Sequence, residues 1–215
     1  SVSRFGHDGQ YWEKSAKLLC IMLLSLRGTP FIYQGQEIGM TNFDFTSMGE
    51  VQDVESHNIY GIAKGLGFPA RLRWKIIKAT SRDNARTPMQ WDASPHGGFS
   101  TAKPWLGVNQ NYTTINLASQ LADPSSIWAM YKTMIALRAE SEILKAGAFE
   151  ELQISKDFFA YRRSLEGESL LILLNFSTRN KTAPSEGATL LLSNYHRKVY
   201  DGELKPYEAV ILKES

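Results

Sequence analysis

The stretch Gly28–Glu37 reads GTPFIYQGQE and decides how the first part of the chain is interpreted. Pro30 precedes an apolar run at residues 31–33, and Gly35 follows it. A short apolar run without alternation is typical of a parallel strand that is covered on both faces of its sheet. The sequence therefore predicts a short buried strand at residues 31–33.

Helical patterns lie on both sides of this strand. Apolar periodicity predicts a helix over residues 11–27, and two further helices over 48–66 and 69–79. Another helix is expected from Asp123, which we predict as its N-cap, to about Leu144.

Residues 82–116 show no periodicity and are rich in Gly, Pro, Asn, Asp and Ser. A loop of about 35 residues inside a compact domain is usually functional. We therefore expect functional side chains in this segment.

After Gly147 the pattern changes to short β-rich runs separated by Gly, Asn, Pro or Asp. Such spacing is typical of an antiparallel sandwich. The runs lie at residues 149–154, 158–164, 169–176, 189–192, 198–200 and 209–212. The sequence thus predicts two domains: residues 1–146, with helices and one parallel strand, and residues 147–215, which are all-β.

A single parallel strand cannot form a sheet, because its backbone hydrogen bonds need neighbouring strands. The predicted strand at 31–33 has no second strand of its type in residues 1–146. We therefore expect its partners in another chain or in a part of the protein that this sequence does not contain.

Composition excludes several classes of protein. The 215 residues carry 24 Lys and Arg against 22 Asp and Glu, a net charge of +2 that argues against a dedicated nucleic-acid binder. No apolar run approaches the roughly 20 residues that span a bilayer, and residues 1–10 hold no apolar signal core. The single Cys20 excludes an intrachain disulfide and fits a reducing compartment, so we expect a cytoplasmic protein.

The common catalytic and cofactor motifs are missing. The sequence has no Gly-x-Ser-x-Gly elbow, no Gly-rich phosphate loop and no metal-ligand spacing, so we expect neither a metal nor a cofactor. Residues 69–86 carry a basic run that fits either a phosphate site or a solvated helix face. Its members are Arg71, Arg73, Lys75, Lys78, Arg82 and Arg86.

The most informative stretch is Ser81–Asp92, SRDNARTPMQWD, which combines two guanidinium groups, two carboxylates, amides and an indole. Sugar sites use this mixture, because planar forks bind hydroxyl pairs and an aromatic face packs on the ring. The stretch Ser81–Asp92 is therefore a candidate sugar-binding segment. A purely structural, well-hydrogen-bonded loop is the alternative.

Two of these stretches resemble a known family. Arg82–Asp92 resembles the loop after the eighth barrel strand in the oligo-1,6-glucosidase group of glycoside hydrolase family 13, the α-amylase family. Gly28–Glu37 is similar to that family's G-x-P-x-x-Y-x-G-x-E motif, which spans the eighth strand. Ser3–Gly6 resembles residues that follow its fourth conserved region.

The resemblance implies an α/β fold followed by a β fold. Residues 1–146 would be the C-terminal part of a (β/α)8 TIM barrel, with its last helices, strand eight and a long loop. Residues 147–215 would be the family's C-terminal antiparallel β-sandwich. The family's Asp nucleophile, Glu acid/base and second Asp would all precede Ser1, since His7-Asp8 does not match the family's Asn-His-Asp triplet. No catalytic residue is therefore expected in this chain, and we predict that it is inactive alone.

The resemblance implies the C-terminal fragment of a retaining α-glucosidase that hydrolyses α-1,6 bonds of short oligosaccharides. Arg82 or Arg86 would contact glucose, and Asp83 would brace an arginine. A trehalose-6-phosphate hydrolase, with the basic run as its phosphate site, is one alternative; a sucrose isomerase and a non-catalytic carbohydrate-binding or assembly module are others. We expect no nucleic-acid or membrane partner. An exposed barrel edge around residues 30–36 would favour a dimer.

Overall fold

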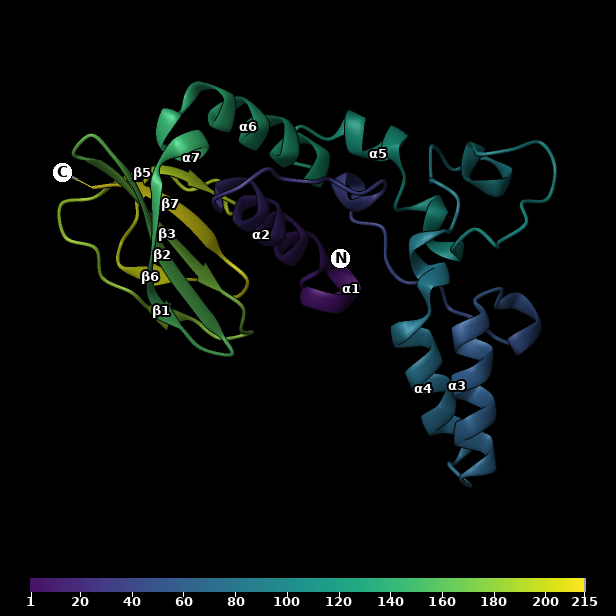
Figure 1. Ribbon diagram of the computed structural model, residues 1–215. Coiled ribbons are helices and arrows are strands. Elements are labelled where there is room, and N and C mark those ends of the chain that lie inside the picture. The colour runs from purple at the N-terminus through teal and green to yellow at the C-terminus, as the bar shows by residue number, and fades with distance from the viewer. Residues whose placement is uncertain (215) are drawn as a thin grey trace. The chain divides into compact units, whose positions relative to one another are not determined.

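The computed structural model describes residues 1–214, and its contacts divide the chain into two compact units (Figure 1). Unit 1 combines Ser1–Gly39 with the C-terminal part from Asp123 onward, and unit 2 is Met40–Ala122. These limits differ from a boundary after residue 146, because the strands after Gly147 share one apolar core with helices that precede them. A domain boundary at 146/147 stays a prediction.

Unit 1 begins with α1 (Val2–Phe5) and α2 (Trp12–Ser25), followed by the short 3-10 turn η1 (Gln36–Ile38). The helix predicted over 11–27 is confirmed as α2. The chain returns to unit 1 with α6 (Ile127–Glu140) and α7 (Glu142–Ala146).

The N-cap of α6 is Ser126, so the prediction of Asp123 is wrong. The Ser126 side chain accepts a hydrogen bond from the backbone N–H of Ala129 at 3.1 Å. The Asp123 carboxylate instead accepts from the Ser125 backbone N–H at 2.8 Å and closes a turn before the helix. A cap must lie directly before the first helical residue, and Asp123 lies three positions too early.

The all-β part forms one five-stranded antiparallel sheet in the order β1-β2-β3-β7-β5, which fits the expected C-terminal β domain. A two-stranded ribbon, β4 with β6, accompanies it. The strands are β1 (Ala148–Ile154), β2 (Phe158–Leu165), β3 (Glu168–Asn175), β4 (Lys181–Thr182), β5 (Thr189–Ser193), β6 (Glu203–Leu204) and β7 (Ala209–Lys213).

The strand predicted at residues 198–200 is wrong. These residues form no strand, and Tyr200 lies half-buried against the sheet core, with its hydroxyl donating to the Ala183 carbonyl at 2.6 Å. An aromatic residue in a loop that covers a sheet produces the same local pattern as a strand residue.

Both faces of the sheet are covered. Successive side chains along β3 point to opposite faces and pack into two separate apolar clusters. Ile172 lies on the face that packs against helices α2 and α6, with Tyr161 and Ile211 beside it. Leu171 and Leu173 lie on the opposite face with Leu204 of the ribbon. The layers are therefore helices, sheet and ribbon, and Cys20 is buried as a free thiol in the helical layer.

Two arginines fasten the C-terminal end of α2. Arg163 is fully buried, and its guanidinium donates to the carbonyls of Ser25, Ile143, Gly147 and Ala148. Burial lowers the pKa of Arg163. These carbonyls lie near the ends of α2 and α7, where the helix dipoles favour a positive charge.

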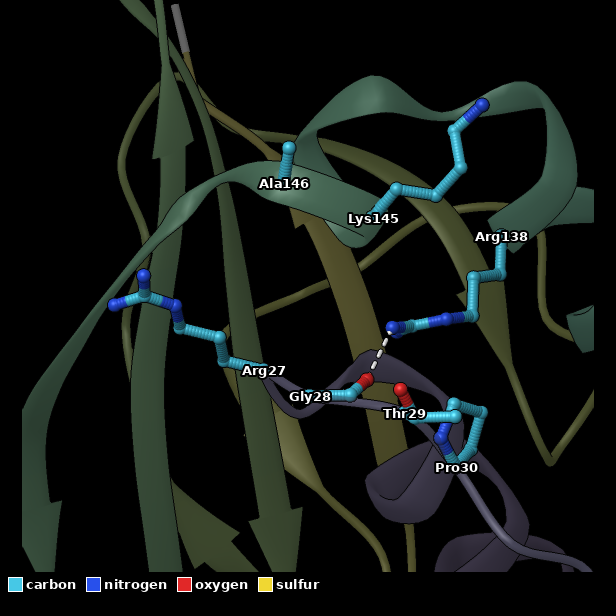
Figure 2. A pocket seen from close by; sticks show the side chains of 7 residues that line it. All are labelled: Arg27, Gly28, Thr29, Pro30, Arg138, Lys145 and Ala146. Carbon is cyan, nitrogen blue, oxygen red and sulfur yellow. Dashed lines mark hydrogen bonds between the residues drawn. The ribbon is translucent and has the colours of Figure 1, made fainter.

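Arg138 of α6 donates to the carbonyls of Leu24, Leu26 and Gly28 at 2.7, 3.2 and 2.7 Å. Figure 2 shows the Arg138 guanidinium directed at the Gly28 carbonyl. Both residues line a depression of about 390 Å³. Its lining residues are Arg27, Gly28, Thr29, Pro30, Arg138, Lys145 and Ala146. Arg138 thus holds the segment before residue 31 through the backbone carbonyls of that segment.

The expected buried strand at residues 31–33 is not formed by the described residues. Phe31 and Tyr33 are 83% and 57% exposed, and the segment is irregular. A parallel strand needs the backbone groups of neighbouring strands, and residues 1–214 supply none here. The missing strand is consistent with the expectation that its partner strands lie outside this chain.

Unit 2 contains a helical hairpin, α3 (Val54–Gly65) and α4 (Ala70–Thr80), and a short helix α5 (Leu117–Ala122) that was not predicted. The helix predicted over 48–66 begins only at Val54, because η2 (Met48–Glu50) forms a separate turn with its own capping box. The helix predicted over 69–79 is confirmed as α4. No helix among residues 1–214 combines the length and apolar character needed to cross a bilayer.

The long loop predicted over residues 82–116 is confirmed, since it contains only three 3-10 turns: η3 (Arg82–Ala85), η4 (Pro95–Gly98) and η5 (Gln110–Thr113). A small core of Phe45, Val51 and Ile77 joins the hairpin to the segment before it. The candidate sugar-binding residues lie on η3, directly after α4.

Candidate functional site

The site begins where α4 ends. Ser81 leaves the helix with ψ 131°, and its hydroxyl accepts a hydrogen bond from the Asp83 backbone N–H at 3.3 Å. This contact starts η3 and places Arg82, Asp83 and Arg86 on one tight turn. The structure therefore brings all three candidate residues together.

Asp83 is completely buried and holds the turn to the segment before α3. Its Oδ2 accepts the backbone N–H groups of Gln52 and Asp53 at 2.7 and 2.9 Å. Its Oδ1 accepts from Nη1 of Arg86 at 3.3 Å. Asp83 thus braces Arg86, as the resemblance implied.

Arg82 is held by Asp53, which is 3% exposed. Oδ1 of Asp53 accepts from Nε of Arg82 at 3.0 Å and lies 3.0 Å from Nη2. Oδ2 of Asp53 accepts from the Ser56 hydroxyl at 2.8 Å and from the backbone N–H of Arg82 at 3.3 Å. Glu55 adds an exposed contact, with Oε2 3.1 Å from Nη2.

The charge on Asp53 is stabilised in place. Burial alone raises the pKa of this carboxyl group, but hydrogen bonds from Ser56 and Arg82 outweigh it, so the pKa lies below its usual value. Asp53 therefore remains an anion beside Arg82 at neutral pH.

Both arginines keep donors available to a ligand. The side chains of Arg82 and Arg86 are 57% and 44% exposed. Within residues 1–214, Nη1 of Arg82 has no acceptor, and Arg86 makes a single bond to Asp83. Guanidinium N–H groups in fixed directions are suited to bind sugar hydroxyls.

The amides and the second carboxylate of the candidate stretch are structural. Gln90 donates to the Ile115 carbonyl at 2.6 Å and to Oδ1 of Asn111 at 3.1 Å. Asp92 accepts the Ser94 backbone N–H at 2.8 Å, and Ser94 lowers the pKa of this exposed carboxyl group. Trp91 remains 47% exposed.

The basic run does not form one cluster of free cations. Arg73 stacks over the Tyr60 ring at 4.9 Å, Lys78 pairs with Asp44, and Arg82 pairs with Asp53. Arg71 and Lys75 are exposed on α4. The run is therefore divided between packing, ion pairs and solvent.

Sequence reasoning missed Asp53, Glu55 and Ser56. Asp53 directly precedes α3, so it has the residue type and position of a helix start. A helix predicted continuously over 48–66 hid this signal, because it placed Asp53 inside the helix.

Residues 1–147 match the family model described as alpha amylase, catalytic domain. The chain belongs to the alpha-amylase family. The resemblance and the fold class inferred from the two motifs are thereby confirmed.

Curated alpha-amylase family relatives include the oligo-1,6-glucosidase of Halalkalibacterium halodurans, which is 45% identical over 97% of this chain. The trehalose-6-phosphate hydrolase of Bacillus subtilis is 40% identical over 99% of it. The chain spans 39% and 40% of the length of these two proteins.

Solved enzyme structures also match this chain. Trehalose-6-phosphate hydrolase of Bacillus licheniformis superposes with a TM-score of 0.91 at 38% identity, over 99% of this chain and 40% of that one. An isomaltulose synthase variant from Erwinia rhapontici gives 0.89 at 36% identity, with the same coverage.

Proposed function

We propose that this chain is part of a retaining α-glucosidase that hydrolyses α-1,6 bonds of short oligosaccharides. Relatives named oligo-1,6-glucosidase or glucan 1,6-alpha-glucosidase, at 45% and 41% identity, support this substrate class. In such a reaction one carboxylate attacks the anomeric carbon, and a second carboxyl group protonates the leaving oxygen and then activates water. In this proposal neither acid comes from this chain, because its sequence does not match the family's Asn-His-Asp triplet, and both are supplied by another part of the enzyme.

The observation that carries the proposal is the fixed orientation of the Arg82 guanidinium, which Asp53 contacts along one edge. One edge, Nε and Nη2, is occupied by Asp53 and Glu55, while Nη1 is free to donate to a ligand. Arg86 supplies further donors from the same turn. In this proposal both arginines bind glucose hydroxyls, and Asp83 contributes by bracing the turn.

The test compares the complete enzyme with this chain on isomaltose and on a chromogenic α-glucoside. The complete enzyme is expected to hydrolyse both, and the chain is expected to hydrolyse neither, because it carries only pocket residues. Turnover by the isolated chain would overturn the assignment of the acids. Inactivity of the complete enzyme would instead favour a non-catalytic binding module.

A trehalose-6-phosphate hydrolase is the second candidate. Relatives with that name are 40% and 43% identical, and Arg71 and Lys75 are exposed on α4 close in sequence to η3. The discriminating measurement is the ratio of kcat/KM for trehalose 6-phosphate to that for isomaltose. A ratio well above one would replace the α-1,6 proposal.

We further propose that the protein works in the cytoplasm. We also propose that the exposed edge at residues 30–36 pairs with a second copy of this chain. Support for the compartment comes from Cys20, the single cysteine, which is free and buried. Support for pairing comes from Phe31, Ile32 and Tyr33, which are 83%, 40% and 57% exposed. Cell fractionation tests the first proposal, and gel filtration tests the second.

A further inference from the structure

The start of α3 and the turn η3 exchange carboxylate contacts. Asp83 of η3 accepts the backbone N–H groups of Gln52 and Asp53, and Asp53 in return accepts the backbone N–H of Arg82. We call this pair of carboxylates, Asp53 and Asp83, the carboxylate clasp. Both members are buried, at 3% and 0% exposure, so solvent screens their contacts little.

The carboxylate clasp fixes the main chain of Arg82, and Asp53 also fixes its side chain. Oδ1 of Asp53 lies 3.0 Å from both Nε and Nη2 of Arg82. Because a guanidinium group is planar, contacts on the Nε and Nη2 edge also set the direction of Nη1. Nη1 of Arg82, for which residues 1–214 supply no acceptor, is therefore held in one orientation.

We propose that Asp53 is a positioning residue for substrate binding, acting through Arg82 by aiming its Nη1 donors. The inference rests on the proposed function, in which Arg82 binds a glucose hydroxyl. It assigns a role to the N-terminal end of the α3–α4 hairpin, since Asp53 directly precedes α3.

Asp53 carries this role and Glu55 does not. The Glu55 side chain is 61% exposed and makes one contact with Arg82. Exposed ion pairs of this kind contribute little, because water and salt screen them and a long side chain must be ordered. Asp53 is buried and makes several hydrogen bonds, including one from Ser56 that orients its carboxylate.

The first experiment measures kcat/KM of the complete enzyme for isomaltose in a double-mutant cycle of Asp53→Asn and Arg82→Ala. Each single variant is expected to lose about tenfold to hundredfold, which is typical of a lost hydrogen bond to a charged group. If Asp53 acts through Arg82, adding Asp53→Asn to Arg82→Ala costs nothing further. If the losses of the two single variants in kcat/KM multiply in the double variant, the proposal is overturned. Asp53→Asn would then act independently of Arg82, as a general structural defect does.

The matched control is Asp44→Asn, which removes a carboxylate from an exposed ion pair with Lys78 in the same unit. It is expected to leave kcat/KM unchanged. Ser56→Ala is the milder probe if Asp53→Asn does not fold, because it removes only the hydrogen bond that orients the Asp53 carboxylate. It should show a smaller loss, again absent in the Arg82→Ala background.

The second experiment needs no activity and uses NMR of the isotope-labelled chain. The Nε–H signal of Arg82 is expected to exchange slowly with water in the wild type, at an unchanged rate in Asp44→Asn, and about tenfold faster or more in Asp53→Asn. An unchanged exchange rate in Asp53→Asn would overturn the positioning role. An inactive complete enzyme with the expected NMR result would reject the proposed function and leave the orientation of Arg82 by Asp53 established.

Discussion

At the residue scale, the site depends on two buried carboxylates that serve different parts of one turn. Asp83 bonds to backbone N–H groups and to Arg86, whereas Asp53 bonds mainly to Arg82. A buried carboxylate is tolerated only where hydrogen bonds replace its hydration. The turn therefore owes its shape to two acids whose contacts lie about 30 residues away along the chain.

Replacing Asp83 by Asn is expected to lower the free energy of unfolding of the chain by about 2–4 kcal/mol. The amide oxygen can keep the two backbone N–H bonds that Oδ2 accepts, but the NH2 group then faces Nη1 of Arg86, and the buried negative charge is lost. Urea unfolding followed by circular dichroism checks this value. Asp44→Asn, on an exposed ion pair, serves as the control and should stay within about 0.5 kcal/mol of wild type. A loss as small for Asp83→Asn would contradict the assigned contacts.

Stability should also depend on the ionisation of Asp53. Its pKa in the folded state lies below the usual value of 3.8, so its stabilising contribution is present above that value and is lost as the pH falls through the folded-state pKa. The stability difference between wild type and Asp53→Asn is therefore expected to be constant above about pH 5 and to shrink as the pH falls below 3.8. Unfolding measurements across this range test the sign. A difference that grows as the pH falls would show that the carboxyl group is neutral in the folded chain.

At the element scale, helix limits follow from single capping residues. The hydroxyl of Ser126 caps α6, and the hydroxyl of Ser81 starts η3, where the chain leaves α4. In both places the side chain satisfies a backbone N–H that has no partner inside the helix or turn. Local sequence suggested both regions, but the geometry of the chain selected the residue that acts.

Ser126→Ala is expected to destabilise unit 1 by about 1 kcal/mol, because the Ala129 N–H loses its acceptor at the buried start of α6. Thermal unfolding of the chain measures the change. Ser125→Ala, one position earlier, removes a hydroxyl that bonds to Asp123 on the surface and is expected to cost less than half as much. Equal effects of the two variants would contradict the cap at Ser126.

At the scale of the whole molecule, one segment of unit 1 remains uncovered. Residues 31–33 expose apolar side chains and form no strand, while Arg138 holds the loop immediately before them. A segment that exposes several apolar side chains and lies in no sheet favours association with another strand. This segment is where we expect the chain to pair with a further copy.

Replacing Phe31 and Tyr33 by Lys together is expected to shift the chain toward the monomer, since like charges oppose edge-to-edge pairing. Sedimentation velocity across a range of concentrations measures this shift. Val199→Lys is the control for general charge effects, because Val199 is 74% exposed and lies far from residues 31–33 in the sequence. A wild-type chain that stays monomeric at high concentration would reject the pairing.

Much of the architecture could be predicted from the sequence. The periodicity of α2, the strand pattern after Gly147 and the missing periodicity of residues 82–116 each gave the correct type of structure. Short elements such as α5, β4 and β6 were missed, because a few residues carry too little periodic signal. The strand at residues 198–200 was wrong because burial of Tyr200 depends on the sheet that it covers.

The sequence by itself determined the family motifs, the order of elements and the three residues of the candidate turn, because these depend on residue types at short spacing. The tertiary structure alone decided that Asp53 meets Arg82 and that Asp83 meets Gln52. These contacts join segments about 30 residues apart, and their geometry depends on how the α3–α4 hairpin closes. The exposure of residues 31–33 was likewise decided in three dimensions, since burial of a strand is a property of its neighbours.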